Sequence, residues 1–139
     1  MSVREYSMTR DSTRQLSPSF RVREFVCKGS DVVLIDDELV VLLQCIRERF
    51  GKPVHITSGY RTAEHNAAVG GSKSSQHLLG RAADFYVEGV PVATVAAYAE
   101  TLLPGRGGIG RYPKDAKHPK RMTGWVHIDT RTNKSRWKG

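Results

Sequence analysis

The stretch Ser74–Asp84 (SSQHLLGRAAD) places an imidazole and a carboxylate seven residues apart, on either side of a glycine. Its carboxylate, Asp84, belongs to an apolar run over residues 82–87 that predicts a buried strand, and His77 precedes that strand by one turn. This spacing is typical of metal ligands. Zinc prefers nitrogen and carboxylate oxygen donors at about 2.0–2.2 Å, and a catalytic zinc keeps three protein ligands and one open position. The fold must therefore bring a third ligand to this stretch.

The candidate third ligand is His127, within residues 124–131 (GWVHIDTR) near the end of the chain. The alternating pattern predicts a strand on which His127 and Asp129 point to the same face. One carboxylate and two neutral imidazoles would leave a divalent ion with a net charge of about +1, enough to acidify water. We therefore expect one zinc ion at His77, Asp84 and His127.

Longer motifs surround these ligands. The pattern SxHxxGxAxD is matched at Ser75, His77, Gly80, Ala82 and Asp84. The sequence SGYRT, residues 58–62, precedes it. In these motifs, and over residues 20–137, the chain resembles the zinc D-Ala-D-Ala carboxypeptidase family (M15 peptidases), particularly its small peptidoglycan-cleaving members from bacteria and phages. The resemblance implies an α+β fold of the hedgehog/DD-peptidase type, with helices flanking a small antiparallel sheet that carries the zinc site. No HExxH occurs, which argues against the commoner zinc protease folds.

Two further residues of these motifs are candidates for substrate contact. Arg61 follows the Gly59 turn, where a guanidinium can bind a substrate carboxylate or stabilise an oxyanion. The arginine of this element binds substrate or the transition state in similar proteins, so the resemblance gives Arg61 that role; the alternative is a structural salt bridge. Ser75 is expected to orient a ligand or to contact substrate.

The match with the family departs at the general base. Many relatives have a glutamate three residues before the last histidine ligand, or another histidine two residues before it, whereas this chain has Gly124 and Trp125. Asp129 is the best replacement within the motif, because a carboxylate within about 2.6–3.2 Å of a water can take its proton. The alternative for Asp129 is a supporting role, accepting a hydrogen bond from a histidine ligand or an arginine.

Two segments have helical periodicity. Apolar residues recur at helical spacing over residues 36–50, with Asp36 as the cap and Gly51 as the stop. A second helix is predicted over residues 91–103. Both helices are expected to pack on one face of the sheet.

The length bounds the number of domains. The 139 residues suffice for one core but not for a second domain. The polar, arginine-rich start lacks periodicity, so we expect residues 1–19 to be a loose arm that wraps the domain or is partly disordered, and residues 20–139 to form one catalytic domain. Cys27 and Cys45 have no CxxC spacing and are expected to be buried, free side chains.

Positive charge is concentrated at the C-terminal end. Of the net charge of +8, residues 110–139 hold nine Lys or Arg against two Asp. Such an end either favours anionic polymers (nucleic acid, teichoic acid or peptidoglycan carboxylates) or is a solvated tail that helps solubility. Nucleic-acid binding is disfavoured, because the basic stretch lacks interleaved aromatic residues and a recognition motif.

No apolar run approaches the ~20 residues that cross a bilayer, and the start MSVRE opens no apolar segment of signal-peptide type. We expect no membrane span, and a monomer made in the cytoplasm that acts on the cell wall after phage lysis or from a virion. The function implied is a zinc metallopeptidase of peptidoglycan stem peptides, either a D,D-carboxypeptidase or an endopeptidase, from a phage or prophage. The alternative is a noncatalytic zinc-stabilised wall-binding or phage structural module.

Overall fold

Five strands form the main sheet in the order β5-β6-β8-β7-β9. They are β5 Val54–Ser58, β6 Ala82–Val87, β7 Gly107–Tyr112, β8 Trp125–Asp129 and β9 Lys134–Lys138. The first three pairings are antiparallel, and β9 pairs with β7 in parallel. This computed structural model, which describes residues 2–139, confirms the predicted α+β class. The sheet is mixed, however, where a purely antiparallel one was expected.

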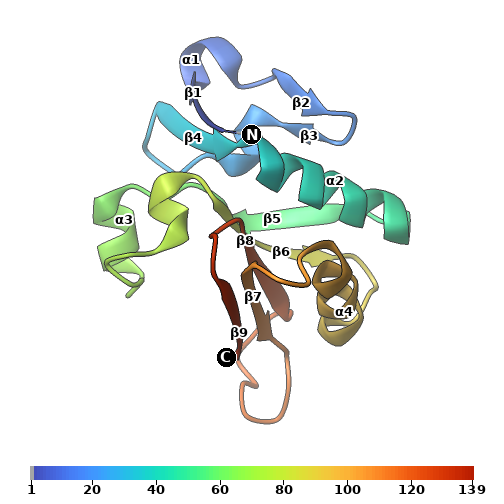
Figure 1. Ribbon diagram of the computed structural model, residues 1–139. Coiled ribbons are helices and arrows are strands. Elements are labelled where there is room, and N and C mark those ends of the chain that lie inside the picture. Colours follow the sequence, from blue (N-terminus) through green and yellow to red (C-terminus); the bar gives the residue numbers. More distant parts are fainter. Residues whose placement is uncertain (1) are drawn as a thin grey trace.

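Two helices cover one face of the sheet (Figure 1), and both were predicted to within a residue at each end. They are α2, Asp37–Phe50, and α4, Val92–Leu102. Asp36 caps α2 by accepting a hydrogen bond from the backbone N–H of Glu38 at 3.0 Å. Gly51 ends α2 in the left-handed conformation, which glycine adopts without strain.

Alternation along the strands separates the core from the site. Phe85, Val126 and Ile128 face the helices and are each at most 1% exposed. Because successive strand residues point to opposite faces, their neighbours Asp84 and His127 point away from the helices. The site therefore lies on the face of the sheet that α2 and α4 leave free.

The N-terminal segment is folded, so the expectation of a loose arm is wrong. Two small sheets form it: β1 Val3–Ser7 with β4 Val32–Asp36, and β2 Gln15–Ser17 with β3 Phe20–Arg21, both antiparallel. In the chain, α1, Met8–Asp11, lies between β1 and β2, and the 3-10 turn η1, Val22–Phe25, lies between β3 and β4. Tyr6 is buried at 7% exposure and joins the core, which explains why this polar segment is ordered.

The segment that carries the sequence motifs folds into short turns. It contains α3, Ala63–Ala68, and the 3-10 turn η2, Gln76–Leu79. Gly80 ends η2 at a φ of +72°, and a Cβ there would lie 2.4 Å from the Leu34 carbonyl oxygen of β4. Only glycine satisfies both conditions. This turn connects η2, which carries His77, to β6, which carries Asp84.

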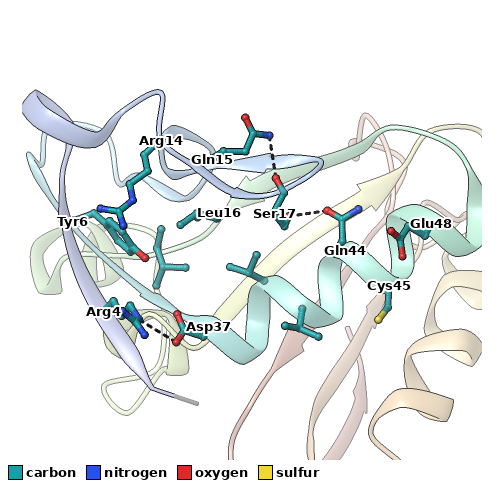
Figure 2. A pocket seen from close by; sticks show the side chains of 13 residues that line it. Arg4, Tyr6, Arg14, Gln15, Leu16, Ser17, Asp37, Gln44, Cys45 and Glu48 are labelled. Carbon is teal, nitrogen blue, oxygen red and sulfur yellow. Dashed lines mark hydrogen bonds and ion pairs between the residues drawn. The ribbon is translucent and has the colours of Figure 1, made fainter.

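A hollow of about 560 Å³ lies between the N-terminal strands and α2 (Figure 2). Arg4 and Arg14 stand at one end of it, and Gln44 and Glu48 of α2 stand at the other. None of the site residues predicted from the sequence lines it.

No helix within residues 2–139 is long and apolar enough to cross a membrane. The two cysteines are free as expected; Cys27 is buried and Cys45 is only partly buried.

Candidate metal centre

Three side chains converge on the free face of the sheet: His77 from η2, Asp84 from β6 and His127 from β8. Asp84 and His127 are directly opposite each other in the antiparallel β6–β8 register, which accounts for their closeness. One ligand atom from each of the three residues lies within 4.8 Å of the other two. The grouping predicted from the motif is present in the fold.

His77 is oriented by a contact on the far side of its ring. Its Nδ1 donates to the Gly59 carbonyl oxygen at 2.7 Å, and its Nε2 lies 3.4 Å from Asp84 Oδ1. Because a carbonyl can only accept, Nδ1 carries the hydrogen and Nε2 is left with its lone pair. Ser75 accepts a hydrogen bond from the His77 backbone N–H at 3.2 Å, so it fixes the turn that holds this ligand.

His127 is oriented in the same way, with its ring nitrogens exchanged. Its Nε2 donates to Asp129 Oδ2 at 2.7 Å, and its Nδ1 lies 3.0 Å from Asp84 Oδ1. A histidine whose outer nitrogen donates to a carboxylate is the usual supporting arrangement at metal sites. Nδ1 is therefore the atom of His127 that faces the other two ligands.

The donor set fits zinc. Three donors at the usual zinc distances in a tetrahedral arrangement lie about 3.3–3.6 Å apart. The two contacts of Asp84 Oδ1, at 3.4 Å to His77 and 3.0 Å to His127, are close to that spacing. Two imidazole nitrogens and one carboxylate oxygen also match zinc's ligand preference and leave a coordination position open.

The charges at the centre favour an ionised Asp84. Burial opposes its ionisation, but the close His127 and His77 rings outweigh burial and hold the pKa of this carboxyl well below its usual range. Burial likewise disfavours a charged His127, whereas Asp129 and Asp84 raise its pKa overall. Asp84 is thus ionised, the state in which a carboxylate can bind a metal ion.

Asp129 lies beneath the centre and is fully buried. Arg131 binds it at two points, Nε to Oδ1 at 2.8 Å and Nη2 to Oδ2 at 2.7 Å, and the Gly108 N–H donates to Oδ1 at 2.9 Å. Burial raises the pKa of Asp129, but the hydrogen bonds from His127 and Arg131 outweigh it, so the pKa lies well below the usual range. Both oxygens are occupied, and Asp129 does not line the groove above the ligands.

Arg61 also reaches the centre. Its Nη2 donates to Asp84 Oδ2 at 3.2 Å, its Nε to Ser58 Oγ at 3.0 Å and its Nη1 to Asn66 Oδ1 at 3.3 Å. Asn66, which is 4% exposed, in turn donates to the Ser72 carbonyl oxygen at 2.8 Å. No sequence motif pointed to Asn66, and only the fold reveals that it joins Arg61 to the loop before η2.

Aromatic residues that sequence reasoning did not assign to the site form one of its walls. The Trp137 ring lies 5.0 Å from the His127 ring, centroid to centroid, and its Nε1 donates to the Tyr112 hydroxyl at 2.7 Å. Trp137 lies over Gly110, where a Cβ would come within 2.5 Å of the indole. The sequence signal for this aromatic wall is Gly110, a glycine within a strand, which pairs with His127 on β8 and with Trp137 on β9.

A groove of about 490 Å³ runs over the ligands. It is lined by residues 70–72 and 74–76, which lead into and begin η2, and by Tyr112, Arg131, Ser135 and Trp137. His77, Asp84, His127 and Arg61 also line it. Asp84 is the one carboxylate in this lining among residues 2–139.

A protein-family model described as Peptidase M15 matches residues 18–129. The chain belongs to the peptidase M15 family. The matched region contains His77, Asp84 and His127 of the candidate centre, together with Arg61, Ser75 and Asp129, and ends before Arg131 and Trp137.

Two relatives of this M15 chain carry the name MepK. It is 35% identical over 91 residues to a probable peptidoglycan L,D-endopeptidase MepK of Haemophilus influenzae, an alignment that covers 62% of this chain and 43% of the relative. It is 34% identical over 84 residues to the peptidoglycan L,D-endopeptidase MepK of Escherichia coli K12, with 57% of this chain and 41% of the relative covered. The matches thus span less than half the length of these relatives.

Proposed function

We propose that this chain is a zinc-dependent peptidase that hydrolyses peptide bonds in peptidoglycan stem peptides, as an endopeptidase. The observation that carries the proposal is the convergence of His77, Asp84 and His127 in the floor of a groove. Membership of the M15 family supports the reaction class. The two relatives named as peptidoglycan L,D-endopeptidases support the substrate class.

Zinc, when bound, supplies Lewis-acid polarisation of the scissile carbonyl and a lowered pKa for its water. The chain's own residues orient the side chains that would hold the ion. Gly59 and Asp129 set the tautomers of His77 and His127, so that both rings offer a lone pair to the ion. Arg61 orients Asp84 and adds a fixed positive charge beside the place where the carbonyl oxygen becomes negative.

Asp129 belongs to the supporting group in this proposal and is not the general base. Its two oxygens accept hydrogen bonds from His127, Arg131 and Gly108, and its side chain is fully buried. A general base must come within hydrogen-bond reach of the water that it deprotonates. An enclosed carboxylate with both oxygens occupied is suited to holding His127 instead.

The printed names of the two relatives, both L,D-endopeptidases, support an endopeptidase over a carboxypeptidase. The substrate chemistry follows the printed names of the two relatives.

One observation favours a second function, a noncatalytic zinc-stabilised wall-binding module. Asp84 is the one carboxylate that lines the groove within residues 2–139, so the lining offers no second carboxylate to act as a base. A module of this kind would bind zinc and cell walls without producing fragments.

Mass spectrometry of purified peptidoglycan distinguishes these functions. Walls containing both D,D- and L,D-cross-links would be incubated with zinc-loaded protein, chelated protein and the His77→Ala variant, with His118→Ala from the exposed 113–124 loop as a matched control. If the chain is an endopeptidase, zinc-loaded wild type and His118→Ala convert cross-linked dimers to monomers, whereas chelated protein and His77→Ala do not. Release of free D-alanine alone would indicate a carboxypeptidase. Digests identical to buffer, with zinc still bound, would support the binding module.

A further inference from the structure

The two arginines in the groove differ in what their nitrogens already bind. Each nitrogen of Arg61 has a protein partner: Ser58, Asn66 or Asp84. Its side chain is 15% exposed. Arg61 is therefore largely committed to holding Asp84 and the loop beside it.

Arg131 keeps one end of its guanidinium free. Nε and Nη2 bind the two oxygens of Asp129, while Nη1 has no hydrogen-bond partner within residues 2–139. The side chain is 25% exposed and lines the groove. Its guanidinium carbon also lies 5.5 Å from the centre of the Trp137 ring. Asp129 and Trp137 thus hold this guanidinium in place, and Nη1 is left without a hydrogen-bond partner within residues 2–139.

A guanidinium in this state is an anion-binding group. It is charged at every relevant pH, and Asp129 raises its pKa further. Because two contacts already fix the side chain, binding a ligand orders little that was mobile. Arg61 and Arg131 line the groove together with Asp84, and Asp129 lies directly behind Arg131. These two guanidinium groups and two carboxylates balance, so a bound divalent ion would leave the groove positively charged. A carboxylate is the anion that a peptide substrate brings.

We propose that Arg131 and the Trp137 wall form a carboxylate-binding subsite beside the metal centre, in which Arg131 selects stem peptides with a free carboxylate near the scissile bond. The inference rests on the proposed function. Peptidoglycan stem peptides carry side carboxylates on their glutamate and diaminopimelate residues, and some walls carry amides at these positions. The subsite would discriminate between the two, because an amide offers Arg131 no negative charge.

The test compares two synthetic cross-linked stem peptides that differ only in a carboxylate or a carboxamide at diaminopimelate. With wild type, kcat/KM for the carboxylate peptide should exceed that for the amide by about 10-fold or more, the worth of a charge-assisted hydrogen bond. With Arg131→Gln the ratio should fall to near one, mainly through KM. Arg131→Lys, which keeps the charge but loses the fixed geometry, should fall between them.

Two controls separate recognition from structural damage. Asp129→Asn removes the partner that holds both Arg131 and His127 but keeps the guanidinium, so it should lower activity on both peptides and retain a preference for the carboxylate. Arg111→Gln removes one positive charge from an exposed residue on β7 outside this groove, and it should leave the ratio unchanged. A ratio in Arg131→Gln equal to that of wild type overturns the proposal, as does a wild type without preference.

A binding measurement tests this proposal independently of the peptidase proposal. Tryptophan fluorescence, to which Trp137 of the groove and Trp125 both contribute, would be titrated with the same two peptides in the presence of chelator, where no hydrolysis occurs. Tighter binding of the carboxylate peptide by about 10-fold in wild type, lost in Arg131→Gln, would uphold the subsite even if neither peptide were ever cleaved. Equal binding of the two peptides by wild type would refute the subsite even in an active peptidase.

Discussion

Nε2 of His127 lies 2.7 Å from Oδ2 of Asp129, and the other nitrogen of the same ring lies 3.0 Å from Asp84. The imidazole is thus held between a buried carboxylate and a ligand carboxylate. The hydrogen bond from His127 Nε2 to Asp129 fixes the tautomer of the ring. Measuring metal affinity in a variant that changes this hydrogen bond therefore tests the role of Asp129.

Asp129→Asn should weaken zinc binding by about 10–100-fold, the usual cost of losing a partner that orients a ligand. The measurement is competition against a chelator of known affinity. Activity lost by this variant should return in large part at saturating zinc. Unchanged zinc affinity, combined with a loss of activity that added zinc does not restore, would instead identify Asp129 as the base.

Asn66→Ala should destabilise the protein by about 1–3 kcal/mol, because it leaves the Ser72 carbonyl and one Arg61 nitrogen without their buried partner. Urea unfolding of the chelated protein measures this loss directly. His65→Ala, at an exposed neighbour on α3, is the matched control and should stay within about 0.5 kcal/mol of wild type. Equal stability of the two variants would show that the Asn66 contacts contribute nothing.

Gly110→Ala should displace Trp137 from His127, since the new Cβ would lie 2.5 Å from the indole. We expect a loss of about 1–3 kcal/mol from overpacking, together with a changed near-ultraviolet signal of the tryptophan. At Gly105 a Cβ meets nothing within 4 Å, so Gly105→Ala should be close to neutral. An unaltered tryptophan spectrum in Gly110→Ala would count against the aromatic wall.

Asp31 ties the N-terminal strands to the rest of the chain and gives them a pH dependence. Hydrogen bonds from Thr9 and Ser7 lower the pKa of its carboxyl. A lowered folded pKa means that the stabilisation is fully present above the unfolded value and is lost as pH falls through the folded value. Asp31→Asn should therefore melt below wild type at pH 6, with the gap closing toward pH 2 in thermal melts of chelated protein. A difference in melting temperature that stays constant over this pH range would exclude the ionised Asp31 carboxylate as its cause.

The elements that were predicted carry their signal locally. Helix α2 was predicted because leucines recur along its buried face between Asp36 and Gly51. The grouping of His77, Asp84 and His127 was predicted because two of them share a short motif and the third lies on a strand with clear alternation. The helix and the motif each carry their signal within a few residues, and His127, 43 residues beyond Asp84, carries its own in the strand around it.

The elements that were missed depend on distant partners. Strand β1 fully buries only Tyr6, so its sequence lacks the alternation that marks a strand, and its pairing with β4 supplies the order. Strand β9 (KSRWK) looks like a basic tail, because it lies at the edge of the sheet and pairs on one side with β7. Asn66 and Arg131 were missed for another reason: their partners Arg61, Ser72 and Asp129 lie two to six residues away, but no motif marks these pairs.

The central claim is that one zinc ion binds at His77, Asp84 and His127, and metal analysis of the purified protein tests it most directly. Wild type and the His55→Ala control, which changes an exposed histidine on β5, should each retain one zinc per chain after dialysis. His77→Ala, Asp84→Ala and His127→Ala should each retain far less while keeping the far-ultraviolet spectrum of a folded chain. Zinc at one per chain in all three ligand variants, or none in wild type, would contradict the account.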